Sequence, residues 1–187
     1  MSDYDFARAE CARYLRETYM SRLQRALEVL PPADLWWQPH PDCISVGNVL
    51  LHLEGNVRQW ILSGLGGAPD ARERSAEFLP NVILADELVA HGRDAASLLG
   101  RLEATVNAAA ALIAALSDDV LRAPVTIQGF ETTGLGAVLH VVEHFSWHTG
   151  QVVWIAKARA GAAHGLALYD DAAINAARNP GSSEPAP

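Results

Sequence analysis

The sequence predicts an all-α fold, an up-down four-helix bundle with long loops between the helices. Three observations indicate this fold. Four long segments place apolar residues at steps of three and four, as on one face of a helix. Proline and glycine residues mark where these segments end. The length of 187 residues suits one domain with a core of its own.

The first helix is expected over about residues 4–30. It ends at Pro31-Pro32, because proline interrupts the helical hydrogen bonds. Its apolar stripe consists of Cys11, Leu15, Tyr19, Leu23, Leu27 and Leu30. The proline-rich segment 31–44 that follows is expected to be an irregular, packed connection.

The second helix is expected over about residues 45–63. Ser45 is its expected N-cap, and the glycines after residue 63 suit a helix end. Its stripe consists of Val46, Val49, Leu50, Leu53, Val57, Trp60 and Ile61. The polar segment 68–81 predicts an ordered surface loop or a short helix.

The third helix is expected over about residues 88–116. Its apolar and small residues recur with an average step of 3.5, which is typical of antiparallel bundle packing. These residues are Leu88, His91, Ala95, Leu98, Leu102, Thr105, Ala109, Leu112 and Leu116.

The last part of the domain begins with residues 122–133, where alternating residues around Gly129 predict a small hairpin or an extended loop. The fourth helix is expected over about residues 133–160. A short helix within 164–178 follows. One domain is therefore expected over residues 1–178, with a disordered tail over 179–187 that is rich in Pro, Gly and Ser.

The composition narrows the class of protein. The net charge is −8, with 14 basic and 22 acidic residues, and an acidic surface repels nucleic acid. The two cysteines, Cys11 and Cys43, lack the spacing of a disulfide framework, and the acidic N-terminus without an apolar stretch is not expected to be a signal peptide. The longest uncharged helical run, between Glu103 and Asp118, is too short for a membrane span. We therefore expect a cytoplasmic protein that binds neither nucleic acid nor membrane.

Three of the seven histidines lie four residues apart in the fourth helix, at His140, His144 and His148, so all three share one face. Imidazoles one turn apart can bind one metal ion. His140 and His148 are about 12 Å apart along the axis, so an ion takes one adjacent pair. His52 in the second helix can add a third ligand.

The spacing leaves the pair open between 140/144 and 144/148. Residues 140–144 also read H-x-x-E-H, the inverted zinc-protease signature, although the chain is short for that class.

The remaining residues of interest carry simpler interpretations. Trp36-Trp37 is expected to pack as core aromatics or to cover the site. Arg72 and Arg74 are expected as solvated charges, or as arginines that hold an anionic substrate.

Two segments, residues 51–61 with His52 and residues 144–151 ending in H-T-G-Q, resemble the DinB-like (damage-inducible) superfamily. The resemblance is closer to one of its branches of uncharacterised bacterial proteins. The Trp37-Gln38-Pro39 loop, the segment 72–78 and Gln128-Gly129 also match, so the resemblance covers about residues 5–170.

The resemblance implies a four-helix bundle, often a homodimer, that holds a divalent metal with three histidines. Here these are His52, His144 and His148, and His140 becomes a neighbour of the site. Asn56 and Gln151 are then side chains that support the ligands, while Arg74 and Trp37 are further candidates for the substrate site. Three imidazoles accept zinc, nickel, copper or iron. The divalent ion expected here is zinc, nickel, manganese or iron.

Characterised relatives include thiol-dependent S-transferases and isomerases that use low-molecular-weight thiols. The resemblance therefore implies a metal-dependent enzyme of thiol S-transferase or hydrolase type with a small-molecule substrate. The alternative is a non-catalytic metal-binding module for a stress response or for a protein partner.

Overall fold

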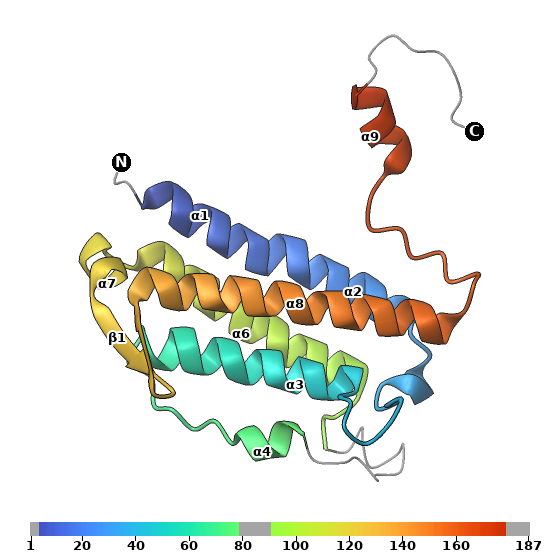
Figure 1. Cartoon of the computed structure of the whole chain (residues 1–187), viewed down its shortest axis with the longest axis horizontal. Coiled ribbons are helices and arrows are strands. Elements are labelled where there is room, and N and C mark those ends of the chain that lie inside the picture. The colour runs from blue at the N-terminus through green and yellow to red at the C-terminus, as the bar shows by residue number, and fades with distance from the viewer. Residues whose placement is uncertain (1–3, 79–90, 179–187) are drawn as a thin grey trace.

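The computed structural model describes residues 4–78 and 91–178, and the statements below concern these residues. The described residues form four long helical segments, which lie side by side (Figure 1). The first runs without a break through α1 (Asp5–Arg13), the π-helical segment η1 (Tyr14–Tyr19) and α2 (Met20–Val29). It ends just before Pro31, as its sequence predicts, and the short helix η2 (Pro32–Asp34) begins the connection that follows.

The second long segment comprises α3 (Val46–Val57) and the π-helical segment η3 (Arg58–Ser63). The expected cap at Ser45 is confirmed. The Ser45 hydroxyl accepts a hydrogen bond from the Asn48 backbone N–H, at 3.1 Å, and the Asn48 side chain accepts one from the Ser45 N–H. Because both residues are buried, this capping box fixes where α3 begins, two turns before His52.

The third long segment, α6 (Ala95–Ala115), begins later than expected. His91 lies outside the helix, and Leu88 lies outside the described residues. Gly92 adopts a left-handed conformation with φ of 61°. The Asp94 side chain then accepts a hydrogen bond from Ser97 N–H at 3.0 Å and caps the helix. The polar segment before it contains the short helix α4 (Arg74–Glu77).

The last part of the chain confirms the expected hairpin. After α7 (Asp118–Arg122), the strands β1 (Pro124–Ile127) and β2 (Phe130–Thr133) pair antiparallel. Gln128 and Gly129 both have positive φ, as a two-residue hairpin turn of type I′ requires. The fourth long helix, α8 (Gly134–Ala160), starts at the Thr133 cap, and α9 (Asp171–Arg178) follows. The tail 179–187 lies outside the described residues.

The directions of the helices differ from a simple up-down bundle. Glu54 contacts Arg101 at 3.4 Å, and Arg58 contacts Thr105 at 3.4 Å, so α3 and α6 run in the same direction. The expectation that successive helices alternate is therefore wrong at this point (Figure 1). Apolar periodicity identifies a buried face but carries no direction, and the long connection after residue 63 allows the chain to return before α6 begins.

The helix α6 is long and apolar enough to cross a membrane by length and composition alone, and 39% of its apolar window is buried. Its buried side chains contribute to the same core as those of the other long helices. They include Leu98, Leu102, Val106, Ala109 and Ile113. A buried stripe of this kind is typical of a core helix, so the structure is compatible with a soluble protein.

Two glycine substitutions test the packing. In Gly134→Ala the new Cβ would lie 2.2 Å from the Val120 carbonyl oxygen, a backbone atom that cannot rotate away. We expect a loss of about 2 kcal/mol in the free energy of unfolding. Gly100→Ala meets no heavy atom within 4 Å, so it should gain about 0.5–1 kcal/mol. Urea denaturation measures both, and equal changes in the two variants would contradict the packing.

Candidate metal centre

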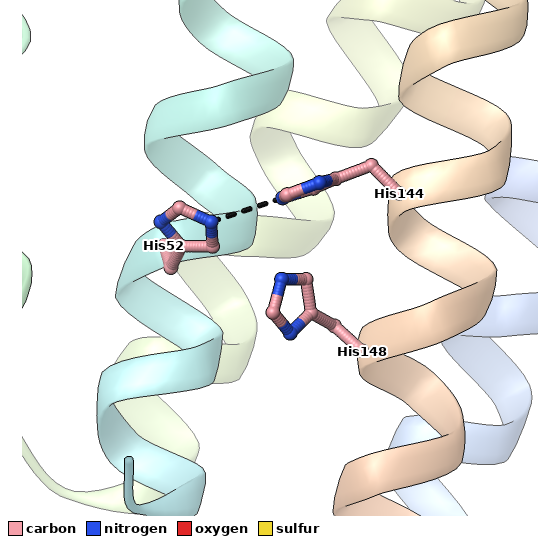
Figure 2. Close-up of side chains that lie close together, drawn as sticks. All are labelled: His52, His144 and His148. Atoms are coloured by element: carbon pink, nitrogen blue, oxygen red, sulfur yellow. Dashed lines mark hydrogen bonds between the residues drawn. The ribbon is translucent and has the colours of Figure 1, made fainter. Parts of the chain in front are cut away.

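Three imidazoles from two helices meet between α3 and α8 (Figure 2). His52 comes from α3, and His144 and His148 come from successive turns of α8. The Nε2 atoms of His52 and His144 are 3.0 Å apart, and one nitrogen from each of the three rings lies within 4.8 Å of the others. The sequence periodicity left two pairs open on α8, and the structure groups 144/148 with His52.

The separation of one pair of nitrogens matches that of two ligands on a shared ion. Two nitrogen ligands about 2.0–2.1 Å from a zinc ion lie about 3–3.4 Å apart. The 3.0 Å separation between His52 and His144 matches that spacing. An all-imidazole donor set suits zinc, nickel, copper or iron, since these ions prefer nitrogen ligands.

Buried polar partners orient His52. Its Nδ1–H donates to Glu77 Oε2 at 2.8 Å, which leaves the Nε2 lone pair facing the other two histidines. Arg72 donates to both oxygens of Glu77, at 2.6 and 2.9 Å. Burial by itself raises the pKa of Glu77, but the hydrogen bonds from Arg72 and His52 outweigh it and hold that pKa below its usual range. The carboxylate therefore stays charged and keeps His52 in one tautomer.

His148 has its own positioning residue. Its Nδ1–H donates to the Gln151 side-chain oxygen at 2.7 Å, so its Nε2 is left for the site. Burial lowers the pKa of His148, although the Gln151 hydrogen bond acts in the opposite direction. Burial, with the nearby His148 and His52, lowers the pKa of His144 to about 3. Both rings on α8 are thus neutral at neutral pH, the form that binds metal.

His140 lies one turn away from this group. Its Nε2 is 3.5 Å from the Asn56 amide nitrogen, and its ring packs 3.9 Å from the Trp60 ring, measured between centroids. The three-histidine group found among the described residues does not include it, and Glu143 is exposed. The residues of the H-x-x-E-H motif at 140–144 therefore do not form a metal site of their own.

A cavity of about 300 Å³ opens beside the histidines. Its lining includes Arg74, Phe78, Trp147 and Gln151, together with the three imidazoles. Among the residues that the sequence suggested as supports for the ligands or as contacts for the substrate, Arg74 and Gln151 line this cavity. Asn56 is instead buried beside His140.

The two tryptophans of the 31–44 connection lie elsewhere. The Trp37 ring carries the Arg159 guanidinium 4.6 Å above its centroid, and the Trp36 ring packs against Gly47. Neither lines the cavity at the histidines. This placement fits the expectation that the two tryptophans pack as aromatics. It does not fit the expectation that they cover the site.

Sequence reasoning missed the Arg72–Glu77 pair. Arg72 was expected as a solvated charge or as a contact for an anionic substrate, yet its side chain is only 4% exposed and pairs with Glu77. Two opposite charges five residues apart in a polar segment were the available signal. That signal does not say which histidine the carboxylate contacts, because the contact spans 25 residues of sequence.

The chain also matches a known protein family. Residues 14–152, well over half of the 187-residue chain, match the family model of the DinB superfamily. The matched range contains all three histidines. A search of the curated proteins gave no match.

Glu77→Gln tests the support of His52. The amide keeps the shape but removes the charge that Arg72 and His52 contact, so we expect zinc affinity to fall about 10–100-fold. The unpaired buried guanidinium should also cost about 3 kcal/mol of stability. Zinc titration and urea denaturation measure these effects. Glu73→Gln, at an exposed neighbouring position, is the matched control and should change neither.

Proposed function

Because the chain belongs to the DinB superfamily, we propose that it is a metal-dependent enzyme of thiol S-transferase or hydrolase type. The proposed ligands of its divalent ion are His52, His144 and His148. The observation that carries the proposal is the convergence of these three imidazoles beside an open cavity of about 300 Å³.

Three protein ligands suit a catalytic site better than a structural one, because they leave coordination positions for water or substrate. A divalent ion in such a site lowers the pKa of a bound water or thiol, so that hydroxide or thiolate is present at neutral pH. The protein's own contribution is to orient two of the imidazoles, His52 through Glu77 and His148 through Gln151.

The cavity residues support a small-molecule substrate. Arg74 is exposed at the cavity and offers a cation to an anionic group of the substrate. Both oxygens of Glu77 are engaged by Arg72, and one also accepts from His52, so this carboxylate is not a free general base. Glu143 is exposed on α8 and is absent from the cavity lining. Proton release to water through the open cavity is consistent with these placements.

The remaining parts of the proposal rest on the resemblance and on composition. We propose a single domain over residues 1–178, a homodimeric assembly and a cytoplasmic location, with a low-molecular-weight thiol as the co-substrate of the transferase activity. Light scattering of the purified protein tests the dimer, and a mass equal to one chain would contradict it.

Metal content tests the ligand set. In untagged protein, His52→Ala, His144→Ala and His148→Ala should each lose stoichiometric zinc, nickel, manganese or iron, measured by elemental analysis. His140→Ala should retain the metal, because His140 is not among the three histidines whose nitrogens converge, although its ring stacks on that of His144 at 5.5 Å between centroids. Equal retention in His148→Ala and His140→Ala would refute the site. Loss confined to His140→Ala would restore the 140/144 pair.

Turnover tests the enzyme proposal. Metal-loaded protein should consume an electrophile in the presence of a low-molecular-weight thiol, or hydrolyse an activated ester, and chelation should abolish the activity. His148→Ala should be inactive in the same assay. If the metal binds but no common thiol or ester reacts, the enzyme proposal fails in favour of a non-catalytic metal-binding module.

A further inference from the structure

The cavity at the histidines adjoins a larger one along α8. This second cavity, of about 670 Å³, is lined by residues of the 39–44 connection and of α8. Trp147 and Gln151 line both cavities, so the two lie next to each other, and together they are called the cleft below. His148 and Trp154 are separated by about 9 Å along the helix axis, given the rise per residue.

The outer part of the cleft is apolar. Trp147 and Trp154 lie two turns apart on one face of α8, and each is 65% exposed. Ile44 and Ile155 complete the apolar lining between them. Two large aromatic side chains left exposed in one groove are typical of a surface that an apolar ligand covers.

The two ends of the cleft differ in charge. Arg74 lies at the histidine end, and no ion-pair partner is found for it among residues 4–78 and 91–178. Asp42 lines the second cavity but not the one at the histidines, and its side chain is 94% exposed. A bound anion is therefore attracted to the histidine end and repelled from the outer one.

We propose that this cleft binds amphiphilic carboxylates of small size. The carboxylate lies at Arg74 beside the histidines, and the alkyl or aryl tail lies along Trp147 and Trp154. The inference deepens the proposed function and rests on it, because it names the chemical class of the molecule that meets the metal.

Binding of a homologous series tests the proposal. Butanoate, hexanoate and octanoate are titrated into the full-length protein, with zinc and without it, by calorimetry. Each added methylene that is buried should tighten binding about threefold to fourfold. Octylamine has the same tail with the opposite charge and should bind at least about tenfold more weakly than octanoate.

Substitutions in the cleft test which residues bind the carboxylate and which bind the tail. Arg74→Gln should weaken octanoate binding and leave octylamine no weaker than before. Trp147→Ala and Trp154→Ala should flatten the dependence on chain length. Because these side chains are exposed, folding should be unaffected. Arg178→Gln and Phe6→Ala change an exposed cation and an exposed aromatic that do not line the cleft, and should leave binding unchanged.

The outcomes separate this inference from the proposed function. Stoichiometric zinc binding with no octanoate binding overturns the inference alone. Octanoate binding in a protein that holds no metal supports the inference and overturns the proposed function. Octanoate binding that requires zinc and survives Arg74→Gln assigns the charge recognition to the ion and overturns the inference. Equal affinity for octanoate and octylamine also overturns it.

Discussion

The buried carboxylate of Glu77 is the contact on which the arrangement of the site depends. It accepts from Arg72 through both oxygens and from His52 through one, while its backbone carbonyl accepts from the Asn48 side chain at 2.7 Å. One residue thus ties α4 to the start of α3 and to the imidazole two turns later. A charge in such surroundings is tolerable because each oxygen has a cationic or N–H partner.

The space for this contact is made by a glycine. A Cβ at Gly55 would lie 2.3 Å from Glu77 Oε1 and 2.8 Å from Arg72 Nε. Glycine inside a helix costs about 0.5–1 kcal/mol relative to alanine. At this position the cost is offset by the close approach of the ion pair to the backbone of α3. The residue that weakens the helix is therefore the one that admits the support of His52.

The direction of the helices explains why that support is available. Since α3 and α6 run in the same direction, the chain after Ser63 has to return before α6 begins (Figure 1). The returning segment carries Arg72 and Glu77 to the side of α3, level with His52. On the other side, α8 runs antiparallel to α3, which sets His144 opposite His52 and His140 opposite Asn56. The topology thus brings two ligands to His52 from α8, and the support of His52 itself from the segment that contains α4.

The sequence by itself determined the long helices, the cap at Ser45, a small hairpin or extended loop around Gly129 and the shared face of the α8 histidines. These features follow from periodicity and local hydrogen bonding, which a single chain segment contains. Periodicity could not choose between His140 and His148, and the resemblance of two short motifs made that choice. Only the tertiary structure decided the parallel course of α3 and α6, the burial of Arg72 and the placement of Trp37 away from the histidines. Each of these depends on contacts between residues far apart in the chain, and local pattern carries no information about which distant partner a side chain will contact.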